Sequence, residues 1–227
     1  MLLFQFRLSQ DLDTYLINPF GLLSHEVTAS SLSKIDINGN IIEHGSTTYN
    51  INKSLFKLKS AIYKARPDIK CILHVQTPST TAVSSLKCGF LQISQEAILC
   101  GNVSYHDYKG SFGYDTDEEV KRLLADDIGP CNKIMFIRNF GVLICGETIE
   151  ETWFYLCNCI QACESQLRIM TAGLDNLILP NDELKKRLID NYNQQLNEIS
   201  LNENKKWKIG ELEFEACMRC LDNAVSY

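Results

Sequence analysis

The chain has 227 residues and a mass of 25.8 kDa, which suits one large domain or one domain with an appendage. Its net charge of −6 argues against a general nucleic-acid binder, because phosphate contacts need clustered Lys and Arg. No apolar run approaches the ~18 residues of a membrane-spanning helix, and Met1–Leu8 is too short and lacks the leading positive charge of a secretory signal.

Ten cysteines in a chain of this length indicate either a disulfide framework or a reducing compartment. Most lie inside apolar periodic segments, as Cys71 does in an expected strand and Cys157, Cys159 and Cys163 do in an expected helix. Cysteine packs in protein cores as a small hydrophobe. Because no secretory signal precedes them, the sequence predicts reduced thiols in a cytosolic protein.

The N-terminal part predicts short strands and turns followed by a helix. Tyr15–Ile17 is an expected strand, and the residues Asn18 to Gly21 after it favour a turn. Asn38-Gly39 between two β-rich segments is the strongest short signal for a hairpin with a two-residue turn. The other elements expected here are a helical turn at 28–31, hairpin strands at 34–37 and 40–43, a hydroxyl-rich loop at 45–48 and a helix at 54–66.

The stretch Ser60–Ser85 predicts a helix end, a buried strand and a helix start. Arg66-Pro67-Asp68 ends the first helix, because the residue before a proline avoids the helical region. Cys71 to Gln76 is β-rich, and its period of two places His74 and Gln76 on one side. Thr77 suits the N-cap of the next helix, with Pro78 at its first position. His74 is therefore expected near a strand end beside a helix start.

The rest of the chain predicts three more strands, two capped helices and a polar C-terminal part with a further helix. Thr116–Glu119 and Thr148–Glu151 both have the capping-box pattern that opens a helix. From Asn181 the composition changes to Asn, Gln, Glu and Lys, which indicates an exposed helix and then a linker. The expected elements are strands at 103–108, 133–138 and 142–145, and helices at 116–128, 148–170 and 210–223.

Several segments together resemble the class II aldolase/adducin family, its adducin branch in particular. The matching strings include LINPFGLLSHEVTASSLSKIDINGN (Leu16–Asn40), GSTTYNIN (Gly45–Asn52), SAIYKARPDIKCILHVQTP (Ser60–Pro78) and, further on, KCGFLQIS, GNVSYHDYKG, RNFGVLICGETIEE and ACESQLRIMTAGLDNLIL. The segment KWKIGELEFEACMRCLDN (Lys206–Asn223) looks like the piece that follows the aldolase-like core in adducins.

The resemblance implies a three-layer α/β/α fold with a mainly antiparallel central sheet and a C-terminal helical extension. It places the aldolase-like head domain at residues 1–180 and the extension at residues 181–227. Nothing before Leu16 resembles the helices with which the family's core opens. We therefore expect an N-terminally incomplete head domain that leaves apolar surface uncovered.

The family's enzymes hold a divalent metal with three histidines, two in an H-x-H pair and one in R-N-H-G, and use a glutamate for proton transfer. Here the H-x-H position is His74-Val75-Gln76, the R-N-H-G position carries Phe140, and the glutamate position falls at Leu55. A catalytic zinc site needs three protein ligands and an open position. The resemblance thus implies a degenerate metal site, no cofactor and no catalytic residue.

Other polar groups are read as structural. We expect His106, next to Asp107, to be hydrogen-bonded at a strand end, and His25 and His44 to be exposed near turns. Cys217-Met218-Arg219-Cys220 has C-x-x-C spacing but lies in an apolar helix pattern without a second pair, which favours packing. The loop Gly45-Ser46-Thr47 is a candidate vestigial phosphate loop, with a simple turn as the favoured alternative.

The function that the resemblance implies is a non-enzymatic, adducin-like protein that binds actin and spectrin and self-associates through its head. Its expected location is the cytoskeleton at the cytoplasmic face of the plasma membrane. Two alternatives stay open: a metal-dependent aldolase-like lyase or epimerase with an unrecognised metal arrangement, and a truncated regulatory partner of a full-length adducin. The apolar stripes of the helices at 148–170 and 210–223 are the candidate contact surfaces.

Overall fold

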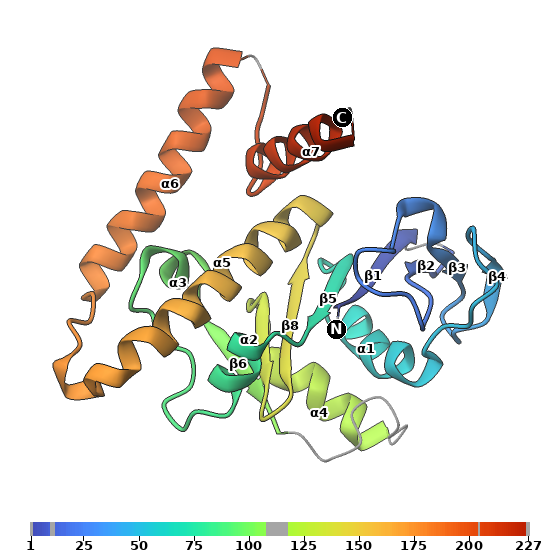
Figure 1. Cartoon of the computed structure of the whole chain (residues 1–227), viewed down its shortest axis with the longest axis horizontal. Helices are drawn as coiled ribbons and strands as arrows, with labels where there is room; N and C mark the ends of the chain where they lie inside the picture. The colour runs from blue at the N-terminus through green and yellow to red at the C-terminus, as the bar shows by residue number, and fades with distance from the viewer. Residues whose placement is uncertain (1, 10–11, 108–117, 204, 226–227) are drawn as a thin grey trace.

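The computed structural model describes residues 2–9, 12–107, 118–203 and 205–225 (Figure 1). The strands are β1 (Leu2–Ser9), β2 (Thr14–Ile17), β3 (Ser33–Ile35), β4 (Ile41–Glu43), β5 (Cys71–Val75), β6 (Val103–His106), β7 (Ile134–Ile137) and β8 (Gly141–Gly146). The helices are α1 (Lys53–Ala65), α2 (Pro78–Ser84), α3 (Gln95–Leu99), α4 (Glu118–Ile128), α5 (Ile149–Ile169), α6 (Asp182–Glu203) and α7 (Glu211–Val225).

The strands form one eight-stranded sheet in the order β4-β3-β2-β1-β5-β8-β7-β6, with helices on both faces. Six of the seven neighbouring pairs are antiparallel, and only β6 and β7 run parallel. The predicted three-layer, mainly antiparallel α/β fold is confirmed. Thr116, Asp117 and Tyr108, which belonged to an expected helix start and an expected strand end, lie outside the described residues.

Strand β1 was not predicted, although it joins the two halves of the sheet. It pairs with β2 on one side and with β5 on the other, so without it β2–β4 would not be joined to the rest of the sheet. The usual burial pattern of a strand is inverted in β1, because the polar side chains of Gln5 and Arg7 face the core while the Phe6 ring is only partly buried. The Arg7 guanidinium donates to the Tyr15 hydroxyl at 3.1 and 3.2 Å and to the Tyr63 carbonyl oxygen at 3.3 Å. These bonds stabilise a polar group that would otherwise be costly to bury.

The loop between β3 and β4 corrects the expected two-residue Asn-Gly turn. The strands are shorter than predicted, and five residues, Asp36 to Asn40, connect them. The Asp36 carboxylate accepts from the Asn38 and Asn40 backbone N–H groups at 2.9 and 2.8 Å. Gly39 adopts a φ of +76°. An aspartate-centred turn therefore replaces the tight turn, because a side-chain acceptor satisfies the loop's donors.

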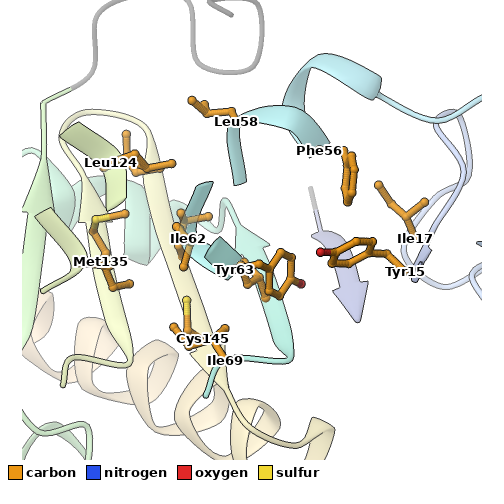
Figure 2. Close-up of a cluster of buried hydrophobic side chains, with 14 of the residues drawn as sticks. Tyr15, Ile17, Phe56, Leu58, Ile62, Tyr63, Ile69, Leu124, Met135 and Cys145 are labelled. Carbon is orange, nitrogen blue, oxygen red and sulfur yellow. The ribbon is translucent and has the colours of Figure 1, made fainter. Parts of the chain in front are cut away.

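Helices α1 and α4 cover one face of the sheet. Figure 2 shows Phe56, Ile62 and Tyr63 of α1 facing side chains of the strands. Tyr63 contacts the Tyr15 ring at 5.1 Å between centroids and donates its hydroxyl to the Gln5 carbonyl oxygen at 3.1 Å. This core contains strand residues from β2, β3, β5, β7 and β8, so it reaches across most of the sheet on this side.

Helices α2, α3 and α5 cover the opposite face. The apolar stripe of α5 is covered by the rest of the chain, because Leu156 and Cys163 are buried and Trp153, Ile160 and Leu167 pack, partly buried, against the same core. Much of it packs with strand residues such as Phe136 and Ile144. The prediction that this stripe is a surface for other proteins is therefore wrong, because the chain's own sheet already covers it.

The C-terminal helices pack back onto the head (Figure 1). Helix α6 lies against α3, and α7 lies against α5, where the Trp153 and Phe214 rings meet edge to face at 6.5 Å. Trp207, in the connection between α6 and α7, is 9% exposed, and its backbone N–H donates to the Ser200 hydroxyl at 2.9 Å. The exposed helix and linker predicted from Asn181 onward are confirmed, whereas a domain boundary at residue 180 stays a prediction.

Because Gly210 lies very close to α5, substitutions there test whether the C-terminal segment docks on that helix. Gly210 has a φ of +82°, and a methyl group there would collide with the Glu150 carbonyl oxygen. Gly101 has a similar φ of +70° but open space around it. We expect Gly101→Ala to cost about 1–2 kcal/mol for the left-handed backbone alone. Gly210→Ala should cost about 1–3 kcal/mol more, because overpacking adds to the strain.

Urea denaturation of both variants measures these losses, and hydrogen exchange locates them. Faster exchange should appear in α7 for Gly210→Ala only. Equal losses in the two variants, with α7 equally protected, would contradict the docking of the C-terminal segment against Glu150.

Candidate functional site

His74 lies in the middle of the sheet, on the face that α1 and α4 cover. It stands in β5 directly opposite Leu3 of β1 and Leu143 of β8. Directly paired residues share a face, and Leu143 belongs to the core beneath α1 and α4. The side chain is 0% exposed, and burial, followed by the nearby Lys59, holds the pKa of the imidazole well below its ordinary value. His74 is thus a neutral ring within an apolar layer.

The structure brings His74, Gln76 and Phe140 together. The imidazole and the Phe140 ring stack with centroids 5.3 Å apart and planes at 17°. The Gln76 side-chain amide donates to the Phe140 carbonyl oxygen at 3.1 Å. Phe140, which stands where the resemblance would place a histidine, therefore packs its ring on the His74 imidazole.

The turn between β7 and β8 places Phe140 at this site. Asn139 adopts a φ of +58° and Gly141 a φ of +151°, so the chain reverses within three residues. A Cβ atom on Gly141 would lie 2.6 Å from the Val75 carbonyl oxygen. Only glycine lets the turn approach the end of β5 this closely, and that approach puts Phe140 over His74.

Leu55 occupies the first turn of α1, where its side chain is buried. Asn52 caps this helix, its side-chain oxygen accepting from the Leu55 backbone N–H at 2.9 Å. Leu55, which the resemblance relates to the proton-transfer glutamate of the family's enzymes, is 4% exposed. A leucine can neither take nor give a proton, so this position supplies no acid or base.

Lys59, one helical turn further along α1, is a group that sequence reasoning missed. Its side chain is 0% exposed, and its ammonium nitrogen has no hydrogen-bond partner among the described residues. Burial lowers the pKa of Lys59 to about 7. The available signal was its spacing, because Lys59 lies three residues after Phe56 and three before Ile62, on the apolar stripe of the helix.

The residues at the site do not fit a divalent metal. A zinc site with open coordination needs three ligands of the imidazole, thiolate or carboxylate type. Here one imidazole is joined by an amide that donates to a carbonyl oxygen and by a phenyl ring. Among the described residues, no group of three or more His, Cys, Asp and Glu side chains is arranged to hold a metal ion.

The loop at Gly45 packs against the short helix Ala29–Ser31. A Cβ atom on Gly45 would lie 2.5 Å from the backbone of Ser31, and the Ser46 N–H donates to the Ser30 carbonyl oxygen at 2.7 Å. The Thr47 hydroxyl is buried, and the described residues offer it no hydrogen-bond partner. A vestigial phosphate loop at Gly45, Ser46 and Thr47 stays a prediction.

The other polar candidates have structural positions. His106 is buried at the end of β6, and its Nδ1 lies 2.7 Å from an Asp127 carboxylate oxygen, which confirms the hydrogen-bonded histidine but with a partner from α4. His25 and His44 are exposed, as expected. Burial raises the pKa values of the Cys71 and Cys145 thiols to about 12, so neither is poised as a nucleophile.

A sequence profile described as "Class II Aldolase and Adducin N-terminal domain" matches residues 6–167. The chain belongs to this family. The match begins ten residues before Leu16, at which the family resemblance in the sequence begins, and so includes half of β1. Leu55, His74, Gln76 and Phe140, which the resemblance relates to the family's metal and proton-transfer positions, all lie within the matched residues.

Among curated proteins, alpha-adducin of Rattus norvegicus is 46% identical over 219 residues, which cover 96% of this chain and 29% of alpha-adducin. The protein hu-li tai shao of Drosophila melanogaster is 38% identical over 244 residues, covering 96% of this chain and 21% of that protein. The chain thus spans less than a third of the length of the curated relatives it matches. It is an adducin-like member of the family.

Among solved structures, an aldolase II superfamily protein from Pseudomonas syringae has a TM-score of 0.74 and 32% identity, covering 90% of this chain and 85% of that chain. L-fuculose 1-phosphate aldolase from Glaciozyma antarctica PI12 has a TM-score of 0.71 and 24% identity, covering 91% and 83%. The second likeness establishes the fold alone.

The buried Lys59 predicts a stability change with a defined pH dependence. Because the folded protein lowers the pKa of Lys59 from 10.5 to about 7, the native state binds this proton less readily than the unfolded state does. The penalty is fully present below about pH 7 and disappears as pH rises toward 10.5. We expect Lys59→Met to stabilise the protein by about 3–5 kcal/mol at pH 7, and by much less near pH 10.5.

Denaturant unfolding of wild type and variant at both pH values measures this difference, and comparing the two proteins cancels groups that titrate in both. Lys57→Met, on the exposed side of the same helix, is the matched control and should change stability by less than about 0.5 kcal/mol. A loss of stability in Lys59→Met, or a gain independent of pH, would contradict the buried, uncharged amine.

Proposed function

We propose that this chain is a non-catalytic, adducin-like head domain whose activity is protein–protein interaction. Its proposed setting is the spectrin–actin skeleton at the cytoplasmic face of the plasma membrane. Actin and spectrin are proposed partners through the relation to adducins, and the longer relatives leave room for contacts that this span does not supply. Among the described residues, no helix has the length and apolarity needed to cross a membrane.

The observation that carries the proposal is the stack of Phe140 on His74. The buried imidazole of His74 is present, but it is surrounded by the Phe140 ring and the hydrogen-bonded Gln76 amide. Leu55 occupies the proposed proton-transfer position. Lewis-acid catalysis by a protein-bound metal needs ligands that hold the ion at defined geometry. Residues that pack on His74 rather than coordinate an ion support a role in binding.

Self-association is the second part of the proposal. Exposed large apolar side chains concentrate in the stretch from the end of α5 into α6, where Ile178 is 95% exposed and Leu179 is 59% exposed. Contiguous exposed apolar residues are typical of protein contact sites. This stretch replaces the α5 stripe as the candidate contact surface. Met218 and Leu221 of α7 are also exposed and provide a further contact.

The metal content of purified protein tests the loss of catalysis. After incubation with zinc or manganese and removal of free ions, we expect wild type to retain far less than one ion per chain. Gln76→His combined with Phe140→His should retain more, because it restores the three-histidine set. Gln194→His with Gln195→His, which adds two imidazoles on the exposed surface of α6, is the matched control.

Near-stoichiometric metal on wild type that disappears in His74→Ala would contradict the proposal. Cleavage of a phosphorylated ketose or hydroxy-aldehyde donor by wild type, abolished by the same substitution, would do so independently. Either result would favour the alternative of a metal-dependent lyase.

Light scattering after gel filtration tests self-association. At micromolar concentration we expect wild type to form oligomers, and Ile178→Glu with Leu179→Glu to weaken association by about tenfold or more, because two charges would have to be desolvated in the contact. Ile42→Glu, at an exposed residue of β4, is the control and should associate as wild type does. A wild-type monomer at micromolar concentration would contradict the proposal.

A further inference from the structure

A groove lies between helices α1 and α4, next to the β3–β4 loop. Its volume is about 560 Å³, within the range of small-ligand sites. Small side chains, including Ser60, Ala61 and Ala125, line it and leave it hollow. The site position His74 is buried under the sheet-facing side of α1, so the groove is separate from it.

The groove carries a concentration of positive charge in a chain whose net charge is −6. Four cationic side chains line it, and Glu118 is the single carboxylate among the described lining residues. Lys57 and Lys64 are seven residues apart on α1 and therefore lie on the same side of the helix. Lys121 and Arg122 enter from α4. Two helices thus direct cations toward one hollow.

Half of this charge has no carboxylate partner among the residues that the structure describes. Lys121 pairs with Glu118 at 2.6 Å, and Arg122 pairs with Asp126 at 3.6 Å. Lys57 and Lys64 are exposed and form no ion pair with any described residue. A solvated basic helix face would serve solubility alone, but here the cations surround a concave space built from small residues. Such a space favours an anionic ligand that bridges the two helices.

We infer that this groove binds a small, multiply charged ligand bearing phosphate groups. Phosphate oxygens accept charge-assisted hydrogen bonds from Lys and Arg, and several phosphates on one scaffold can reach cations on both helices at once. The inference does not depend on the proposed function, because no residue of the His74 site takes part. A soluble polyphosphate and a phosphorylated lipid headgroup share this chemistry.

Binding is measured with inositol hexakisphosphate by calorimetry, and with phosphatidylcholine vesicles that contain phosphatidylinositol bisphosphate by co-sedimentation. We expect saturable binding of the soluble probe that weakens as salt is raised, because exposed charges are screened. Lys57→Gln with Lys64→Gln should weaken it by about tenfold or more, since two unpaired cations are lost. Lys186→Gln with Lys206→Gln removes the same charge from exposed positions elsewhere and should have little effect.

Glu118→Gln tests the groove in the opposite direction, because it is expected to strengthen binding of the soluble probe. It removes the carboxylate from the groove at a side chain that is 86% exposed, so folding should be unaffected. Binding of the soluble probe should become several-fold tighter, because Lys121 is released from its ion pair. An effect in this direction cannot come from a loss of folded protein.

The vesicle measurement distinguishes a phosphorylated lipid headgroup from a soluble polyphosphate as the ligand. Binding of both the soluble probe and the bisphosphate vesicles, each weakened by Lys57→Gln with Lys64→Gln, assigns a lipid headgroup. Binding of the soluble probe alone assigns a free polyphosphate, and both results support the inference. Absence of binding in both arms, or binding that the groove variant weakens no more than the control variant does, would overturn it.

Discussion

The sheet face beneath α1 and α4 must exclude water across most of its width, and this constraint determines which side chains can surround His74. The core on that face includes residues of β2, β3, β5, β7 and β8, and the buried polar side chains of Gln5 and Arg7 from β1 lie between them. A histidine in that layer is stable as a neutral ring, and the Phe140 ring covers it. The Gln76 amide can stay because it donates to a backbone carbonyl oxygen. The burial that excludes water from His74 also encloses Lys59, whose desolvation is an energetic cost of this core.

The layered fold of this chain is that of its family. A likeness of 0.74 in TM-score to an aldolase II superfamily protein shows that the layered architecture is retained. The adducin-like relatives extend over nearly the whole chain, including the segment that carries Trp207 and α7. That segment closes over α5 through the Trp153–Phe214 contact and the tight approach at Gly210. It packs against α5, whose apolar stripe the sheet covers, while Ile178 and Leu179 stay exposed.

The sequence predicted most of the layered core because its elements have regular periods and clear caps, as Thr77 and Thr148 illustrate. Strand β1 was not predicted because its inward residues, Gln5 and Arg7, are polar, and the hydrogen bonds of Arg7 to Tyr15 and Tyr63 that make its burial tolerable depend on the tertiary fold. Motif spacing identified His74, Gln76 and Phe140, but their stacking depends on the turn at Gly141. Lys59 was not identified from the sequence because a lysine on a helix is ordinarily exposed to solvent.

The state of the His74 ring is the most direct measure of whether a core has replaced a metal site. Nitrogen-detected NMR of the imidazole reports its protonation and any coordination, while zinc is added and pH is lowered through the range in which exposed histidines gain a proton. Our account predicts ring resonances that stay those of a neutral imidazole and do not move with zinc. A ring that titrates as an exposed histidine does, or shifts in proportion to one equivalent of zinc, would contradict it.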